Sequence, residues 1–195
     1  MSSSTPLPRA PLYPLFLKVR GRRVLVVGAG AIATRKVAEL LAAQARVDVV
    51  APMASDAIET LASEGALTWR ARPFEPVDVD GAWLVVAATS DAAVQRAVFD
   101  AAETHHVFVV AVDDPANGTA HTPAVVVRDP YVLAISSAGE TPALTRLLRE
   151  ILEQVLPDED WVQAARALRA KWRAEGTPMA SRFPELLRLF RERAK

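Results

Sequence analysis

A glycine turn between a strand-like and a helix-like segment constrains this chain more than any other feature of its sequence. The segment 23–43 begins with the apolar run Val24–Val27, continues through Gly28-Ala29-Gly30, and then places apolar residues one helical turn apart. A short β-branched run predicts a buried strand, and the spacing after it predicts an amphipathic helix. The order strand, glycine turn, helix is typical of the start of a βαβ unit in a parallel sheet.

The small residues of this turn each have a steric reason. Gly28 permits a tight turn, and Gly30 lets a ligand approach the backbone because no Cβ stands in the way. Ala33 occupies the third position of the G-x-G-x-x-G/A dinucleotide pattern, where a small side chain lets the helix pack on the strand. The N–H groups at the helix start suit a pyrophosphate. The alternative is an ordinary glycine turn, and the position between strand and helix favours the dinucleotide.

The remainder of the first 115 residues alternates between short apolar runs and helical patterns. Further strands are predicted at 47–51, 67–70, 83–88 and 107–112, and further helices at 54–64 and 91–103, the second capped by Ser90 or Asp91. A proline-broken apolar stretch at 11–17 predicts a short edge strand. The alternation predicts an α/β fold for residues 1–115, with a Rossmann-like, doubly wound parallel sheet.

The pattern changes after Pro115. The apolar runs 124–128 and 131–135 have no helix between them, so they predict an antiparallel pair, and region 116–141 is interpreted as a small dimerisation region. Thr141 as N-cap and Pro142 at the first helical position then predict a helix start. Helices predicted near 142–155, 159–175 and 181–194 form a C-terminal helical domain, residues 142–195.

Composition excludes several classes of protein. The 195 residues include no cysteine, so disulfides and thiolate metal sites are excluded. The 23 basic and 23 acidic residues balance, which argues against general attraction to nucleic acid or to an anionic membrane. Because the sequence shows neither a long uncharged apolar segment nor a secretory leader, we expect a cytoplasmic protein.

Candidate chemistry lies where the parallel strands end, because ligands of open α/β sheets bind there. Asp113 follows the fifth predicted strand, close to where a nicotinamide would lie, and a carboxylate there can act as a general base. Asp114 is interpreted as a turn residue before Pro115. His121 is either a second proton carrier or an exposed loop histidine. The three histidines are too scattered for a metal cage, so no metal ligands are predicted.

The end of the second predicted strand does not decide between NAD and NADP. A NAD-binding sheet usually ends this strand with Asp or Glu on the ribose hydroxyls, and here the position holds Ala51-Pro52-Met53. Asp48 lies within the strand and is expected to point away from the ligand. No arginine follows to hold a 2′-phosphate, so the sequence admits both NAD and NADP.

Several blocks of sequence combine into one pattern. They include Arg35-Lys36 after the glycine turn, Val112-Asp113-Asp114-Pro115, and the stretch from Ile135 through Ser137 to Arg149. In this order they resemble the precorrin-2 dehydrogenase/sirohydrochlorin ferrochelatase family. Larger members carry a methyltransferase domain after this module, so the resemblance implies the stand-alone form.

The resemblance implies an oxidoreductase that oxidises precorrin-2 to sirohydrochlorin with NAD, in siroheme or cobalamin biosynthesis. In some members insertion of ferrous iron follows and gives siroheme. The resemblance further implies a homodimer formed through the region after the Rossmann domain, and it assigns the essential carboxylate to Asp113. The dinucleotide contacts that it implies are Gly28, Gly30, Ala31, Ile32, Pro52, Met53 and Thr89.

The substrate implied by the resemblance is a macrocycle with many carboxylates, which guanidinium groups can pair. The candidate substrate-binding residues are Ser137, Arg128, Arg146, Arg149 and His121. The macrocycle brings four nitrogen ligands, so iron insertion would need no Cys or His cage. Departures from the family at Val110, Ala138 and 119–122 motivate an alternative, a non-catalytic sensor of a dinucleotide or tetrapyrrole. A dehydrogenase of another small acid is a third class, against which the missing His, Lys or Tyr catalytic set argues.

Overall fold

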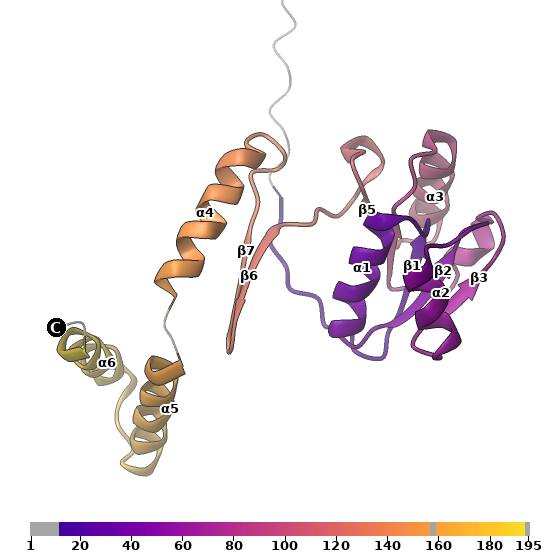
Figure 1. The fold of residues 1–195 in the computed structure, drawn as a ribbon. Coiled ribbons are helices and arrows are strands. Elements are labelled where there is room, and N and C mark those ends of the chain that lie inside the picture. The colour runs from indigo at the N-terminus through magenta and orange to yellow at the C-terminus, as the bar shows by residue number, and fades with distance from the viewer. Residues whose placement is uncertain (1–11, 157–158, 194–195) are drawn as a thin grey trace, which may run out of the picture. The chain divides into compact units, whose positions relative to one another are not determined.

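The computed structural model describes residues 12–156 and 159–193, and the chain divides into two compact units between Thr122 and Pro123 (Figure 1). The three-part division predicted from the sequence, with boundaries after residues 115 and 141, stays a prediction. Each unit has its own architecture.

The first unit is a five-stranded parallel sheet with the order β3-β2-β1-β4-β5, which confirms the predicted doubly wound α/β fold. Its strands are β1 Arg23–Val27, β2 Arg46–Val50, β3 Thr68–Arg70, β4 Leu84–Ala87 and β5 Phe108–Ala111. Its helices are α1 Ala31–Ala42, α2 Asp56–Ser63 and α3 Ala92–Thr104, with the short 3-10 helices η1 Pro76–Val79 and η2 Pro115–Asn117. The strand order reverses between β1 and β4.

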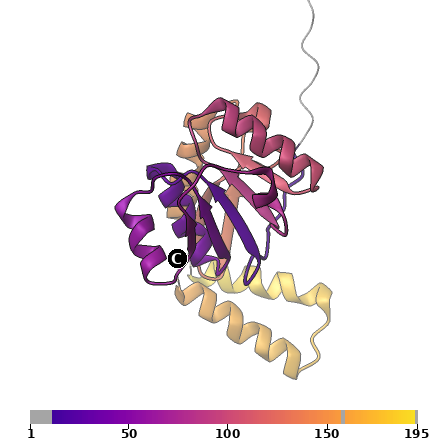
Figure 2. The same cartoon turned by 90° about the vertical axis from the view of Figure 1, so that its right-hand side faces the viewer.

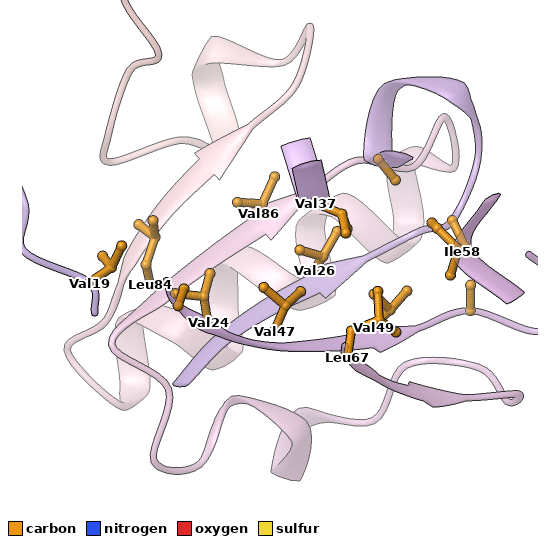
Figure 3. Close-up of a cluster of buried hydrophobic side chains, with 14 residues drawn as sticks. Val19, Val24, Val26, Val37, Val47, Val49, Ile58, Leu67, Leu84 and Val86 are labelled. Atoms are coloured by element: carbon orange, nitrogen blue, oxygen red, sulfur yellow. The ribbon is translucent and has the colours of Figure 1, made fainter. Parts of the chain in front are cut away.

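Apolar clusters cover both faces of this sheet. On one face Val24 and Val26 of β1 pack in a cluster with Val37 of α1 (Figure 3). On the other face Leu25 of β1 lies in a cluster with Val98 of α3. Alternate residues of β1 enter opposite clusters because successive side chains of a strand point to opposite faces. A strand that is buried on both faces has a continuous run of apolar residues. This is why the segment predicted a buried strand of a parallel sheet.

The second unit begins with the predicted antiparallel hairpin, β6 Ala124–Arg128 and β7 Tyr131–Ile135. Helix α4, Pro142–Val155, packs against it. Helices α5 Glu159–Ala174 and α6 Met179–Arg193 lie side by side (Figure 2, orange and yellow). The last predicted helical residue, Ala194, lies outside the described residues.

The start of α4 differs in detail from the prediction. Thr141 takes the N-cap position and Pro142 the first helical position, but the Thr141 side chain makes no capping bond within the described residues. Ser137 supplies the polar contact instead, because its Oγ accepts a hydrogen bond from the Thr141 N–H at 3.1 Å.

The predicted edge strand at 11–17 is wrong for the part that the structure describes. Residues 12–18 form no strand. Pro14 has no N–H to donate to a neighbouring strand, and the Leu15 and Phe16 side chains are 62% and 66% exposed rather than packed. Pro11 lies outside the described residues.

A buried carboxylate fixes the segment between β3 and β4. Asp78 of η1 is 4% exposed, and its carboxylate accepts hydrogen bonds from Arg72 at 2.6 and 2.8 Å and from the Glu75 N–H at 2.9 Å. Burial alone would raise the pKa of Asp78. The bonds from Arg72 and Glu75, with the charges of Arg72 and Arg70, outweigh burial and hold the pKa of Asp78 below its usual value.

We expect Asp78→Asn to lower the free energy of unfolding at pH 7 by about 2 kcal/mol, since hydrogen bonds to a charged group are lost. The pKa of Asp78 is lower in the folded state than in the unfolded state. The carboxylate therefore stabilises the fold above about pH 4, and this contribution is lost as the pH falls through the folded-state pKa. Urea unfolding between pH 7 and pH 3 checks this, because the gap between wild type and variant should narrow toward pH 3. A gap of constant size would contradict it.

Candidate functional site

The loops at the carboxyl ends of the strands start from a shared, hydrogen-bonded edge. Three backbone bonds continue the pairing of neighbouring strands past the strand ends: Gly28 N to Val50 O at 3.0 Å, Ala88 N to Val27 O at 2.8 Å, and Val112 N to Ala87 O at 2.9 Å. The loops after β1, β2, β4 and β5 are therefore held close together on a rigid support, as a preorganised site requires. This edge is the candidate site.

Gly28 lies where the strand order reverses. Its φ is +105°, and a Cβ added to it would lie 2.4 Å from the carbonyl oxygen of Ala88. No side chain fits between the loops of β1 and β4 at that distance. Gly28 is therefore required by the contact between two loops as well as by the turn.

Gly30 has a different role, since its φ of −81° suits any residue. It is the N-cap of α1, and a Cβ added to it would meet no atom of the described residues within 4 Å. Within the described part of the chain no side chain caps α1, so the N–H groups of its first turn are open to a ligand. This open space before an uncapped helix fits the pyrophosphate of a dinucleotide. Ala33 is fully buried between helix and sheet, as the pattern predicts.

The other predicted dinucleotide residues lie on the neighbouring loops. Ala31 and Ile32 are exposed in the first turn of α1, Pro52 and Met53 are exposed after β2, and Thr89 is half-buried after β4. All of them therefore lie at the candidate edge, either at the start of α1 or on a loop. Their contacts with a dinucleotide stay a prediction.

The loop after β2 is joined to the glycine turn. The Ser55 N–H donates to the Ala29 carbonyl at 3.0 Å, and the Ser55 hydroxyl lies 2.9 Å from the Thr34 hydroxyl. Asp48, within β2, is paired elsewhere, because its carboxylate accepts from Arg23 at 2.8 Å and from Arg70 at 3.2 Å. Its charge is therefore neutralised by two arginines of the sheet, Arg23 of β1 and Arg70 of β3.

Asp113 lies two residues beyond β5 and is exposed. Its φ of +57° is in the left-handed region, which Asp adopts more readily than most residues. Among the described residues its carboxylate has no hydrogen-bond partner, so it can accept a proton from a ligand. Asp114 differs, since its Oδ2 accepts from Asn117 Nδ2 at 2.6 Å at the start of η2, as the turn interpretation predicts.

Gln95, which is not among the residues predicted from the sequence, joins the loops after β4 and β5. Its side chain is 5% exposed on α3, and Nε2 donates to the carbonyls of Thr89 at 2.9 Å and Val112 at 3.0 Å. The signal was its spacing, three residues before Val98 and seven before Ala102 on the buried face of the helix. A polar residue in such a row needs buried partners.

The candidate substrate residues are distributed over both units. His121 is exposed in the first unit, and the other four belong to the second. Ser137 Oγ accepts from the Thr145 hydroxyl at 2.9 Å, in addition to its bond at the start of α4. These contacts give Ser137 a structural role, and its role toward a substrate stays a prediction.

The three candidate arginines all have partners on α4. Arg128 donates from both terminal nitrogens to the last carbonyls of the helix, those of Glu153 and Leu156, each at 2.6 Å. Arg146 pairs with Glu150 at 2.9 Å, and Arg149 pairs with Glu153 at 3.0 Å. Such exposed pairs one turn apart contribute little stability and exchange readily. A carboxylate ligand could therefore replace the glutamates at lower cost than it could replace the carbonyls that Arg128 binds.

Residues 12–156 and 159–193 contain neither a candidate metal cluster nor a candidate membrane-spanning helix. No group of three or more His, Cys, Asp or Glu side chains there could hold a metal ion. No helix in these ranges has the length and apolar character needed to cross a membrane.

The chain is similar to known proteins in both of its units. Residues 15–124 match the sequence model of a family described as "Putative NAD(P)-binding". The chain is 48% identical over 144 residues to siroheme synthase 1 of Cronobacter sakazakii, covering 74% of this chain and 31% of that protein. It is 41% identical over 171 residues to siroheme synthase 1 of Aeromonas salmonicida, covering 87% of this chain and 36% of that protein. The chain thus spans about a third of the length of these curated relatives.

A solved structure resembles nearly the whole chain. It is titled SirC, precorrin-2 dehydrogenase, and it superposes with a TM-score of 0.74 at 27% identity, covering 91% of this chain and 89% of that one. The likeness therefore extends beyond the parallel sheet into the second unit.

We expect Gly28→Ala and Gly30→Ala to separate folding from ligand binding. Gly28→Ala should cost about 2 kcal/mol of stability, because the added methyl meets a backbone carbonyl in a strained conformation. Gly30→Ala should cost at most about 1 kcal/mol and weaken dinucleotide binding about tenfold. Thermal unfolding and titration calorimetry check this. Unchanged affinity in a folded Gly30→Ala protein would show that the dinucleotide does not lie against this turn.

Proposed function

We propose that this chain, which belongs to the NAD(P)-binding family that matches its residues 15–124, oxidises precorrin-2 to sirohydrochlorin with NAD. Its relatives and its structural neighbour confirm the resemblance to precorrin-2 dehydrogenases. The observation that carries this proposal is the likeness to a precorrin-2 dehydrogenase over nine tenths of both chains. Many dehydrogenases share a parallel dinucleotide-binding sheet, so a match confined to the first unit would not favour one substrate. A match through the second unit does.

The residues at the sheet edge suit the two halves of this reaction. A bound NAD supplies the hydride acceptor. The uncapped start of α1 and the bare backbone of Gly30 would hold its pyrophosphate, and the Thr89 loop follows β4, the neighbouring strand of the sheet. Oxidation of the macrocycle also releases a proton. Asp113, unpaired among the described residues and supported by β5, would accept that proton as a general base.

We favour NAD over NADP because of the loop after β2. Residues 51–55, Ala-Pro-Met-Ala-Ser, contain no lysine or arginine that could pair a 2′-phosphate. The family implies no acidic residue there, so the ribose would be bound by backbone groups at Pro52 and Met53.

Ferrous iron is proposed as a second substrate, not as a resident metal. Iron insertion into sirohydrochlorin requires a group that takes up the pyrrole protons, and Asp113 offers a free carboxylate for that step. The macrocycle contributes the nitrogen ligands, so the chelation needs no protein metal cage.

The function is tested by anaerobic incubation with precorrin-2 and NAD, which should yield NADH and the spectrum of sirohydrochlorin, with a smaller kcat/KM when NADP replaces NAD. We expect Asp113→Asn to lower kcat by about 100-fold or more, because the general base is lost. Asn keeps the size of Asp and tolerates the same backbone conformation. The affinity for NAD should not change. Full turnover by Asp113→Asn would remove this residue from the mechanism, and absence of turnover by the wild type would remove the function.

We also propose that the chain forms a homodimer through its second unit. Helix α4 carries a row of apolar side chains that are each at least 41% exposed: Leu144, Leu147, Leu148, Ile151 and Val155. The outer face of the hairpin is likewise apolar and open at Val125, Val127 and Val132. Apolar patches of this kind mark interaction surfaces. In a two-fold dimer both copies present the same two surfaces, the apolar row of α4 and the outer face of the hairpin. The surfaces of one copy can therefore bury those of the other.

We expect the protein in solution to have twice the 21.1 kDa mass of one chain. Light scattering after size-exclusion chromatography measures this mass. Leu147→Glu should shift the protein to the monomer, because a charge would be buried in the interface. Ala170→Glu places the same side chain at an exposed position of α5 and should leave the mass unchanged. A wild-type monomer, or equal behaviour of the two variants, would overturn the proposed interface.

A further inference from the structure

We infer that Gln95 is a positioning residue, which holds Asp113 in place relative to the dinucleotide loop at Thr89. The inference rests on the proposed function, since that function gives Asp113 and Thr89 their roles. Gln95 itself is buried on α3 and is assigned no contact with a ligand. It would act through the backbone on either side of the site.

The amide of Gln95 is a double donor between two loops. Nε2 has two N–H groups, and the carbonyls of Thr89 and Val112 accept them at 2.9 and 3.0 Å. The orientation of the amide is fixed, because the reversed amide would place its oxygen against two carbonyl oxygens. One side chain thereby sets the spacing of the loops after β4 and β5.

The bond to Val112 controls the residue that follows it. The Val112 N–H donates to the Ala87 carbonyl at 2.9 Å, so Val112 is held by β4 through its N–H and by Gln95 through its C=O. The Val112 carbonyl belongs to the peptide plane that leads into Asp113. Asp113 has a left-handed backbone, which few residues keep unless their neighbours fix it. Without the Gln95 bond that plane can rotate and carry the carboxylate away.

The other end of the amide indicates that Gln95 serves here as a donor. Gln95 Oε1 is buried and has no hydrogen-bond partner among the described residues. A buried acceptor without a partner destabilises the fold, and an apolar side chain of similar length would avoid that cost. The amide is therefore useful only as the donor that joins the two loops.

The test compares Gln95→Met, which keeps the length of the side chain and removes both donors, with wild type. We expect kcat for precorrin-2 oxidation to fall at least tenfold while the Kd for NAD stays within threefold. Trp69→Phe is the matched control, since it removes a single hydrogen bond from Trp69 Nε1 to the Ala51 carbonyl on the same edge. Its kcat should stay within twofold of wild type. Unchanged kcat in Gln95→Met would overturn the inference.

A double-mutant cycle shows whether Gln95 acts through Asp113. In an Asp113→Asn background, Gln95→Met should lower the residual rate by less than twofold, because the group that it positions is already lost. If the double variant loses kcat by the product of the two single-variant factors, Gln95 does not act through Asp113, and the inference is overturned. If Gln95→Met does not fold, Gln95→Asn replaces it, since the shorter side chain cannot span both carbonyls.

Hydrogen–deuterium exchange of the ligand-free protein gives a readout that needs no turnover. In Gln95→Met the amides of 89–91 and 112–114 should both exchange faster than in wild type and in Trp69→Phe. If the wild type fails to oxidise precorrin-2, the proposed function fails, and this exchange pattern alone decides on the positioning role. Faster exchange confined to α3, or no change, would overturn it.

Discussion

The contact between Gly28 and the carbonyl of Ala88 is the constraint on which the candidate site depends. Because a Cβ at Gly28 would lie 2.4 Å from that oxygen, the loops after β1 and β4 can approach only with glycine at this position. This contact lies where the strand order reverses, which is where open α/β sheets bind ligands. The uncapped start of α1 and the Thr89 loop follow the two strands that meet at this contact, and Asp113 follows β5, the next strand after β4 in the sheet.

The sequence predicted the parallel sheet because its strands are buried on both faces and therefore read as unbroken apolar runs, as in Val24–Val27. The prediction failed at residues 12–17, where apolar composition suggested a strand but Pro14 has no N–H for strand pairing and the apolar side chains are exposed. It also missed η1, whose structure depends on the pairing of Asp78 with Arg72 and on the Glu75 N–H. Such contacts are set by folding of the chain and leave no periodic pattern.

The geometry of the candidate site was predictable where it depends on the backbone alone. The places of Gly28, Gly30 and Asp113 follow from their positions relative to strand ends. The spacing of Gln95 indicated a buried side chain, but the sequence could not show its partners, because they are two carbonyls on different loops. For Arg128 the sequence suggested a substrate contact, but the structure shows a contact within the chain. Its guanidinium group, which would suit an acidic substrate, binds the carbonyls at the end of α4. The substrate that we propose comes from the resemblance to a family, because no residue pattern in the chain identifies it.

We propose that the Asp113 carboxylate, which follows β5, faces a dinucleotide bound over the glycine turn. The most direct measurement is a crystal structure of the protein with NAD. We predict a pyrophosphate at the start of α1 against Gly30, with the Asp113 carboxylate on the same side of the sheet edge as the nicotinamide ring. A nicotinamide on the opposite side of the edge from Asp113, or a pyrophosphate away from α1, would contradict the account.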